Sequence, residues 1–349
     1  MNIRDLRLLV TGASGFIGSR LALHLRRIGV DAEFAGRDTN DAERGRLREL
    51  SSSGIQVHLG DLRDADFVER VVAGRNAILH LAAAQHENEK SEEYFRSINL
   101  GATELLLEKA RASGIRRFVY GSTIGVYGSS KHGTINDYTR TRPLNSYTRT
   151  KLAAEDAVLA NARYFETSIV RIGETYGPGD FRLLKLYKAI DRNRFVMIGN
   201  GKNLRQPIFV EDLIRGLLAT LTSKEAVGEI FPLVGSEPMS TREMVEHIAH
   251  ALERPVPRLR VPLWPVLTAA SVLNVPLRLI GIRSPLHPRS LDFFRKSFVF
   301  STTKAKDLLG FEPATTKFAD GARATLAWYR AQGYLPERTE PALSRTARI

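Results

Sequence analysis

The glycine-rich segment Thr11–Gly18, which reads Thr-Gly-Ala-Ser-Gly-Phe-Ile-Gly, constrains the fold of this chain more than any other stretch. It follows the apolar run Leu6–Val10 and opens a stretch with helical periodicity. In such a strand–turn–helix unit, Gly12 would allow a tight turn, Gly15 would let the backbone approach a pyrophosphate and Gly18 would let the helix pack closely. The N–H groups at the start of the helix would then bind the phosphates. The segment therefore predicts a turn that binds a dinucleotide.

Short apolar runs alternate with longer amphipathic stretches through the first half of the chain. We expect strands at Leu6–Val10, Ala32–Ala35, Ile55–Leu59, Ala77–Ala82, Arg117–Ser122 and Thr167–Ile172. Long helices are expected over Ser91–Ser113 and Ser146–Arg163. Because apolar strands that alternate with helices form parallel sheets covered on both faces, the pattern predicts an α/β fold with a doubly wound Rossmann sheet.

The alternation breaks after about residue 172, where glycine and proline cluster at Gly173–Gly179. We therefore predict a dinucleotide-binding Rossmann domain at 1–172 and a smaller, mixed substrate-binding lobe at 173–335, some strands of which could return to the sheet. The polar segment 336–349 contains proline and several arginines, a composition that predicts a disordered tail.

Charge and composition narrow the class of protein. Lysine and arginine number 51 against 38 acidic residues, which gives a formal net charge of +13. The basic residues are scattered, so we expect no nucleic-acid partner but a basic surface that could attract an anionic substrate or membrane. The chain has no cysteine, which excludes disulfides, thiolate nucleophiles and cysteine-ligated metals and fits a reducing compartment. No metal site is expected. The first residues lack the layout of a signal peptide, so we expect a cytoplasmic protein.

The apolar stretch Val261–Ile280 has two interpretations. Pro262, Pro265 and Pro276 interrupt it and Arg278 adds a charge, so it is too broken to span a bilayer. It could be a buried helix or pocket lid of the second lobe. Alternatively, it could form a peripheral surface that contacts a membrane or a lipid-linked substrate.

The residues that follow the second and third strands bear on the choice of cofactor. Arg37 could pair with the 2′-phosphate of NADP, whereas Asp38 could bind the ribose hydroxyls of NAD. Asp61 and Leu62 are placed to contact the adenine end, although Asp61 could instead cap the next helix. We expect NAD or NADP, with NADP favoured by Arg37.

A second group of residues would transfer protons. Tyr147 and Lys151 are four residues apart in a helical pattern, so they share one face. A phenol has a pKa of about 10, but a neighbouring ammonium favours the phenolate and so makes a base available. Ser122 and Thr123 end the fifth expected strand, at the edge where parallel sheets bind ligands, so either hydroxyl could bond the reacting group.

Several motifs occur in a fixed order: Thr-Gly-x-x-Gly-x-x-Gly (11–18), Gly-Asp-Leu (60–62), His-Leu-Ala-Ala (80–83), Asn-x-x-x-Thr (99–103), Gly-Ser-Thr-x-x-Val-Tyr-Gly (121–128), Tyr-x-x-x-Lys (147–151), Tyr-Gly-Pro-Gly (176–179) and Arg-x-x-x-Phe-Val-x-Asp (205–212). Together they resemble the extended short-chain dehydrogenase/reductases, in particular the nucleotide-sugar epimerase-like members of the NAD-dependent epimerase/dehydratase family.

The resemblance implies roles for matching residues. Thr123, Tyr147 and Lys151 would be catalytic, and Asn99 would buttress the active-site backbone. Ser122, Glu174 and Arg205 would contact substrate, with Arg205 where relatives contact a diphosphate and Glu174 where they often place asparagine. Cofactor contacts would come from Tyr147, Lys151 and the following residues: Gly12, Ser14, Gly15, Phe16, Ile17, Gly18, Arg37, Asp61, Leu62, Leu81, Ala82 and Ala83. A homodimer through Ser91–Ser113 and Ser146–Arg163 is also implied.

Departures from the family pattern narrow the reaction. The related sugar 4,6-dehydratases carry Asp-Glu after the hydroxyl residue, where this chain has Ile124 and Gly125. Decarboxylating members place glutamate at the position of Gly125, and the fucose-synthase type needs a cysteine. We therefore expect an epimerase or oxidoreductase acting on a sugar hydroxyl or carbonyl, most simply of a nucleotide sugar. An NADP-dependent carbonyl reductase, a dehydrogenase of sterols or lipid-linked sugars, and a non-catalytic NAD(P)-sensing protein are the alternatives.

Overall fold

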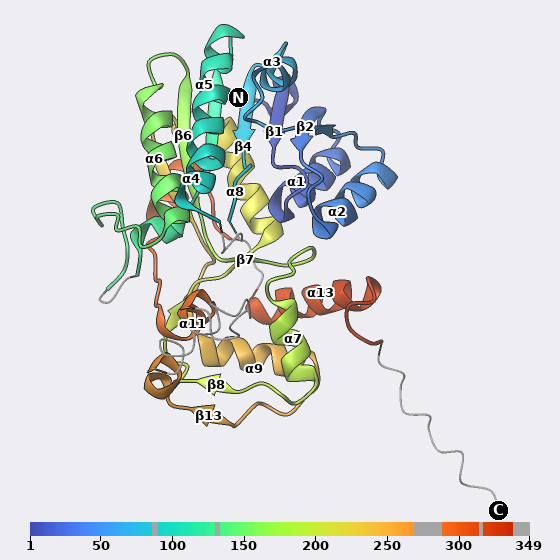
Figure 1. The fold of residues 1–349 in the computed structure, drawn as a ribbon, viewed down its shortest axis with the longest axis vertical. Helices are drawn as coiled ribbons and strands as arrows, with labels where there is room; N and C mark the ends of the chain where they lie inside the picture. The colour runs from blue at the N-terminus through green and yellow to red at the C-terminus, as the bar shows by residue number, and fades with distance from the viewer. Residues whose placement is uncertain (86–89, 130–132, 269–287, 314–316, 338–349) are drawn as a thin grey trace, which may run out of the picture. The chain divides into compact units, whose positions relative to one another are not determined.

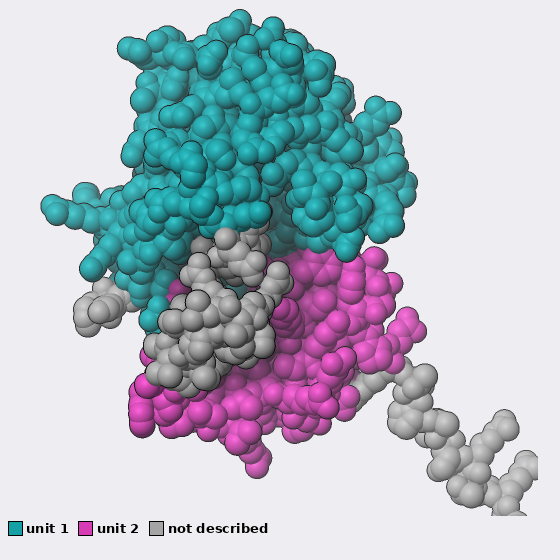
Figure 2. All heavy atoms as spheres, viewed as in Figure 1, with its two compact units in different colours: residues 1–175, 202–240, 295–316 teal, residues 176–201, 241–294, 317–349 magenta. Residues whose placement is uncertain are grey.

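The computed structural model describes residues 1–349 except 86–89, 130–132, 269–287, 314–316 and 338–349. The chain divides into two compact units, coloured teal and magenta in Figure 2. Unit 1 comprises Met1–Thr175, Lys202–Ser240 and Arg295–Thr316, and unit 2 comprises Tyr176–Gly201, Thr241–Phe294 and Lys317–Ile349. Most of the expected tail, 338–349, and the larger part of Val261–Ile280 lie outside the described residues.

A seven-stranded sheet forms the centre of unit 1, in the order β11-β6-β5-β4-β1-β2-β3 with every pairing parallel. Its strands are β1 (Leu8–Thr11), β2 (Ala32–Gly36), β3 (His58–Leu59), β4 (Ala77–His80), β5 (Arg117–Thr123), β6 (Glu166–Ile172) and β11 (Ile230–Leu233). The order reverses between β1 and β4, and ligands of open α/β sheets bind at such a switch point. The predicted Rossmann-like α/β fold is confirmed.

Helices cover both faces of this sheet (Figure 1). Leu8 and Val10 of β1 belong to one apolar cluster and Leu9 to another, because successive side chains of a strand point to opposite faces. The first cluster includes α1 (Phe16–Arg27), α2 (Asp41–Ser52), α8 (Val210–Thr222) and α12 (Thr303–Leu309). The second includes α3 (Ala65–Val72), α5 (Ala102–Ala112) and α6 (Ser146–Ala160).

Some elements differ from their expected bounds. β3 is shorter than Ile55–Leu59, since only His58 and Leu59 pair with β2, while the N–H of Ile55 bonds to Leu50 in the turn after α2. The helix expected over Ser91–Ser113 consists of α4 (Glu92–Arg96), a π-helical turn η2 (Ser97–Gly101) and α5. Such π-turns often lie at functional sites.

Short elements complete unit 1: the 3-10 turns η1 (Ile3–Asp5) and η3 (Ile124–Tyr127), and the two-residue strands β9 (Leu204–Arg205), β10 (Ile208–Phe209) and β12 (Met239–Ser240), of which β9 and β12 pair antiparallel. The strand β7 (Thr175–Tyr176) lies where the chain passes from unit 1 to unit 2.

Unit 2 has a small core of its own. The rings of Tyr187 and Tyr329 meet edge to face at 5.2 Å, and the Tyr187 hydroxyl donates to the carbonyl of Ala322. Its elements are α7 (Leu184–Asp191), β8 (Met197–Ile198), α9 (Thr241–Ala251), β13 (Arg260–Val261), α11 (Pro288–Arg295, whose last residue belongs to unit 1) and α13 (Phe318–Ala331). Within the part of the chain that the structure describes, no helix has the length and apolar character that a membrane crossing requires.

Candidate active site

The glycine turn connects β1 to α1 and can be built only from glycine at two positions. Gly12 has a φ of +78°, and a Cβ there would lie 2.7 Å from the backbone nitrogen of Ala82. A Cβ at Gly18 would overlap the carbonyl oxygen of Gly12. The turn therefore lies directly against the backbone that follows β4, and the first turn of α1 lies directly on the glycine turn.

A pocket opens at the switch point beside this turn. Its walls come from the glycine turn, the ends of β2 and β3, the start of α2, the segment after β4 and the π-turn region: Gly12, Ser14, Gly15, Ala35, Gly36, Arg37, Glu43, Gly60, Asp61, Leu62, Leu81, Ala82, Ala83, Ile98 and Ala102. The structure thus brings together most of the residues expected to bind the cofactor. Phe16, Ile17 and Gly18 form the adjoining first turn of α1.

The ends of β2 and β3 define the charge of one end of this pocket. The backbone N–H of Arg37 donates to the Ser14 hydroxyl at 3.0 Å, which ties the end of β2 to the glycine turn. Asp38 forms an ion pair with Arg44 at 3.3 Å. The Arg63 guanidinium holds Asp61 at 2.5 Å and lowers the pKa of that carboxyl.

The alternative role considered for Asp61 is wrong. The residue that caps α3 is Asp64, whose carboxylate accepts from the N–H groups of Asp66 and Phe67. Asp61 lines the pocket instead.

Helix α6 positions the proton-transfer pair. Asn145 caps its start in a capping box with Thr148, so the helix begins at Ser146. Tyr147 lies in the first turn and packs against the buried cluster of Ala84, Phe95 and Ile98.

One turn further along α6, Lys151 is only 1% exposed, and its Nζ donates to the carbonyl of Gly121 at 2.6 Å. That carbonyl lies two residues before Thr123, so the helix carries the pair to the carboxyl end of β5. Burial lowers the pKa of Lys151 to about 7, opposed by the negative charge of Glu155.

Neighbouring hydroxyls at the end of β5 have different surroundings. Thr123 ends the strand, and its Oγ1 accepts from the N–H of Gly125 at 3.1 Å. Ser122 points to the opposite face of the sheet, is 3% exposed and donates to the carboxylate of Glu155. The structure therefore presents Thr123 at the strand end and binds the Ser122 hydroxyl inside the molecule.

Asn99 joins two segments around Tyr147. In the π-turn, its side chain accepts from the N–H of Ala84 at 2.8 Å and donates to the carbonyl of Ala84 and to the Thr150 hydroxyl, each at 3.1 Å. Asn99 thus links the segment after β4 to helix α6, an arrangement that matches the buttressing role implied by the resemblance.

Two residues expected to contact substrate are paired with each other. Glu174 lies two residues beyond β6, and its carbonyl accepts from the N–H of Ile208. Its carboxylate binds the guanidinium of Arg205 through two hydrogen bonds, of which Nε–Oε2 is 2.8 Å. The Arg205 side chain is 10% exposed and that of Glu174 is 31% exposed. The positive charge of Arg205 is therefore compensated inside the protein.

Sequence reasoning missed a buried polar network beneath the site. Glu155 accepts from Arg171, with Nη2–Oε2 at 2.7 Å, and Nη1 of Arg171 donates to the Tyr127 hydroxyl at 2.7 Å. Glu155 could have been found, because it follows Lys151 by four residues on one face of the same helix. Arg171 lies on β6, directly opposite Ser122 in the register of the sheet, which no local pattern reveals.

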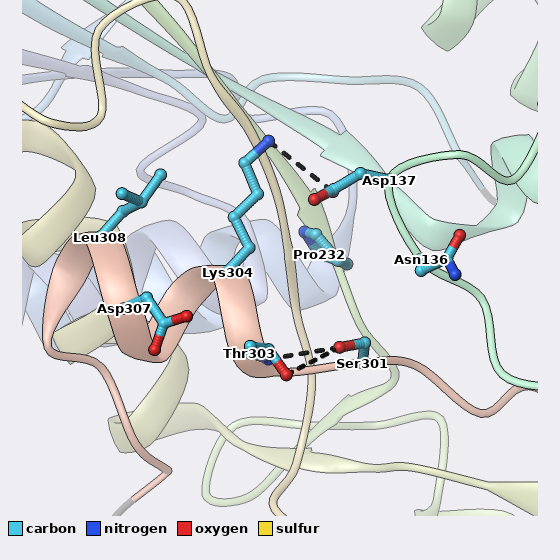
Figure 3. A pocket seen from close by; sticks show the side chains of 8 residues that line it. All are labelled: Asn136, Asp137, Pro232, Ser301, Thr303, Lys304, Asp307 and Leu308. Carbon is cyan, nitrogen blue, oxygen red and sulfur yellow. Dashed lines mark hydrogen bonds and ion pairs between the residues drawn. The ribbon is translucent and has the colours of Figure 1, made fainter.

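A second pocket lies between β11 and α12, and it shares no lining residue with the pocket beside the glycine turn. Figure 3 shows Lys304 reaching toward Asp137 across it. The ammonium of Lys304 is 3.7 Å from Asp137 and 2.7 Å from Glu229. The charge of Lys304 is therefore balanced by two carboxylates. This arrangement is typical of an ion-pair cluster that stabilises the fold.

The chain is similar in sequence and in fold to known enzymes. A model of the NAD dependent epimerase/dehydratase family matches residues 8–233. A dTDP-glucose 4,6-dehydratase of Streptomyces griseus is 30% identical over 341 residues, with 92% of this chain and 93% of that one covered. The sterol-4-alpha-carboxylate 3-dehydrogenase, decarboxylating, of Mus musculus is 27% identical, with 88% and 86% covered. The structure of a UDP-glucuronic acid 4-epimerase from Bacillus cereus in complex with NAD has a TM-score of 0.76 at 23% identity, covers 94% and 99%, and shows the same fold.

Proposed function

Because the chain belongs to the NAD dependent epimerase/dehydratase family, we propose that it is an NAD(P)-dependent epimerase or oxidoreductase that acts on a hydroxyl or carbonyl group of a sugar. The observation that carries this proposal is the hydrogen bond from Lys151 to the Gly121 carbonyl. It fixes the face of α6 that bears Tyr147 at the carboxyl end of β5, where Thr123 lies.

The residues of the switch-point pocket fit a dinucleotide. Gly12 lets the turn lie against the backbone of Leu81 and Ala82, and the start of α1 offers backbone N–H groups to a pyrophosphate. Arg37 lines this pocket, and its guanidinium would pair with the 2′-phosphate if NADP is the cofactor. When bound, the nicotinamide provides hydride transfer to or from the substrate carbon.

Tyr147 supplies the proton chemistry in this proposal. Its phenolate takes the proton of a substrate hydroxyl during oxidation, and its phenol returns a proton during reduction. The charge of Lys151 favours the phenolate. Thr123, at the end of β5, offers a hydroxyl to bond the reacting oxygen. An epimerase and a simple oxidoreductase share this proton transfer and differ in whether the oxidised intermediate leaves.

The surroundings of Gly125 support epimerisation or redox chemistry over water elimination. Elimination needs an acid and a base beside the hydroxyl residue, and Ile124 and Gly125 carry neither. A Cβ at Gly125 would lie 2.9 Å from the methyl group of Thr148, so a side chain fits there only if the Thr148 side chain or α6 moves. These observations favour epimerisation or redox chemistry, whereas the Streptomyces griseus relative is named a 4,6-dehydratase.

Two substrate classes follow from the relatives and the site. Solved structures of similar fold bind UDP-glucose and UDP-glucuronic acid, so a nucleotide sugar is the first candidate. A sterol or lipid-linked sugar is the second, because the Glu174–Arg205 pair leaves less positive charge for a diphosphate. The name of the Mus musculus relative agrees with this second class.

The test compares turnover of the wild type and of Tyr147→Phe on UDP-glucose, UDP-glucuronic acid, dTDP-glucose and a 3β-hydroxysteroid, with NAD and with NADP. We expect Tyr147→Phe to lower kcat about 10²- to 10⁴-fold on every substrate that the wild type accepts. Tyr138→Phe is the matched control, because Tyr138 is 94% exposed and should keep full activity. Full activity of Tyr147→Phe would overturn the proposed mechanism.

A further inference from the structure

Lys151 holds an ammonium group in one of the most enclosed places of unit 1. The side chain is 1% exposed, and burial disfavours the charged form of an amine strongly. If Lys151 is to assist Tyr147, its charge needs support from the protein interior.

Three groups surround the ammonium. The Gly121 carbonyl accepts its hydrogen bond at 2.6 Å. The face of the Tyr120 ring lies 4.1 Å from Nζ, a cation–π contact that is strong when water is excluded. Glu155 stands one turn further along α6 and is also 1% exposed. A carbonyl dipole and an aromatic face therefore contact the buried charge, and the carboxylate of Glu155 stabilises it electrostatically from a longer distance.

The network beneath the site fixes Glu155 in this position. Arg171 binds its carboxylate through Nε and Nη2, and the Ser122 hydroxyl donates to the same group. Arg171 in turn holds Tyr127, both by a hydrogen bond and by lying 4.8 Å from the centre of its ring. Glu155 thus has a fixed orientation, although part of its charge compensates Arg171.

Four elements bring further titratable groups near Lys151, and those on β4 and β5 are neutral. His80 on β4 lies close enough for the ammonium to lower its pKa, which burial takes to about 3, so it stays uncharged at neutral pH. The phenol of Tyr120 has a pKa raised well above its usual value by burial. On α6 itself, Tyr147 and Glu155 are the titratable neighbours, and on β6 Arg171 acts through Glu155.

We propose that Tyr120 and Glu155 are positioning residues that keep Lys151 protonated while Tyr147 transfers its proton. This inference rests on the proposed function of Tyr147 and Lys151 and adds two residues that contact neither substrate nor cofactor in that function.

The proposal predicts the direction in which the pH profile of activity moves when the Tyr120 ring is removed. Without the aromatic face, the pKa of Lys151 falls, so the neutral amine becomes more populated near pH 7. A neutral Lys151 no longer favours the Tyr147 phenolate, so the pKa of Tyr147 rises. The acid limb of kcat/KM for alcohol oxidation therefore moves to higher pH, by about one unit if the desolvated cation–π contact has its usual strength.

The first arm of the test compares Tyr120→Leu with Tyr120→Phe. Phenylalanine keeps the aromatic face and the packing, so its pH profile should overlay the wild type. Leucine removes the face, and its acid limb should move up by about one pH unit. Tyr120 is neutral, so neither change alters the net charge of the site. Identical profiles for the two variants would overturn the role of Tyr120, since lost packing alone does not move the limb.

The second arm measures the protonation of Lys151 directly and does not require an activity assay. The protein is labelled with ¹³Cε,¹⁵N-lysine, and the Lys151 signal is assigned by its absence from the spectrum of Lys151→Met. NMR then follows protonation of the Lys151 amine from pH 5 to 10. The midpoint should fall in Glu155→Gln and Tyr120→Leu and stay in Tyr120→Phe; an unchanged midpoint in both of the first two would overturn the proposal. If Tyr120→Leu lacks a cooperative unfolding transition, it is not properly folded, and the midpoint of Glu155→Gln alone then decides this measurement.

The two arms separate this inference from the proposed function. If Tyr147→Phe is fully active, the proposed function fails, while the NMR midpoints still decide whether Tyr120 and Glu155 hold Lys151 protonated.

Discussion

The guanidinium of Arg205 is bound by the carboxylate of Glu174, although both residues lie where the family pattern suggests contacts with substrate. An arginine that is paired in this way offers little net charge to an anionic ligand. A diphosphate would have to compete with a carboxylate that is already in place. The pair therefore gives a direct test of the substrate class.

We predict that Glu174→Gln strengthens the binding of UDP. The glutamine keeps the size of the side chain but removes its charge, so Arg205 can pair with the diphosphate, and the Kd of UDP should fall about tenfold. Isothermal titration at two salt concentrations checks this, and the gain should shrink at high salt. Glu104→Gln, at an exposed position of α5, is the control and should leave the Kd unchanged. Tight UDP binding by the wild type, with no gain in Glu174→Gln, would show that Glu174 does not limit diphosphate binding.

A second prediction concerns Arg37 and the choice between NAD and NADP. Arg37 lines the pocket, while Asp38 and Asp61 are each held by an arginine, so this end of the pocket favours a phosphate. Arg37→Ser should weaken NADP binding about 10- to 100-fold through loss of a charge-assisted bond, and should change NAD binding little. Titrations with both dinucleotides measure the ratio. A wild type that prefers NAD, with equal losses for both cofactors in Arg37→Ser, would rule out this role.

The glycine turn permits a third prediction with an internal control. Gly12 and Gly29 both have positive φ, but a Cβ at Gly12 meets the backbone of Leu81 and Ala82, whereas nothing lies within 4 Å of one at Gly29. Gly29→Ala should therefore cost about 1 kcal/mol, the backbone penalty alone. Gly12→Ala should cost at least about 2 kcal/mol and should also weaken dinucleotide binding. Urea unfolding measures both, and equal losses would mean that the contact with Ala82 relaxes freely.

The sequence predicted the parts of this molecule that depend on local pattern. Strand–helix alternation gave the Rossmann-like sheet, and the spacing of Gly12, Gly15 and Gly18 located the turn. The four-residue spacing placed Tyr147 and Lys151 on one face of α6. Each of these features is encoded within one or two turns or strands, where periodicity and glycine geometry act directly.

Contacts between distant segments were not predictable in this way. A strand of the region 173–335 was expected to be able to return to the sheet, but the sequence did not show which one, because residues 230–233 of β11 form a short apolar run like many others. The pairs Glu174–Arg205 and Glu155–Arg171 join residues on different elements, and the π-turn at Asn99 depends on bonds to Ala84 and Thr150. Such features follow from the folded arrangement of the elements, so they need the structure. The catalytic roles, the domain bounds and the homodimer stay predictions.

The last prediction concerns stability in acid and depends on His80. Its ring lies between the hydroxyls of Thr11 and Thr103, at 2.6 and 3.0 Å, and is 1% exposed. Burial lowers the pKa of His80 from 6.5 to about 3. Between these two values the unfolded chain binds a proton that the folded chain does not. The contribution of His80 is therefore fully present above about pH 6.5 and is lost as the pH falls, with a slope of up to about 1.4 kcal/mol per pH unit.

Urea unfolding of the whole protein at pH 7, 6, 5 and 4.5 measures this slope. His80→Asn keeps a side chain that can bond both threonines but cannot become cationic, so its stability should fall less steeply with acid even if it is lower at pH 7. His58→Asn is the control, because it removes an imidazole whose side chain is 52% exposed. Parallel slopes for the wild type and His80→Asn would show that other groups govern unfolding in acid, since the proton taken up on unfolding would then not belong to His80.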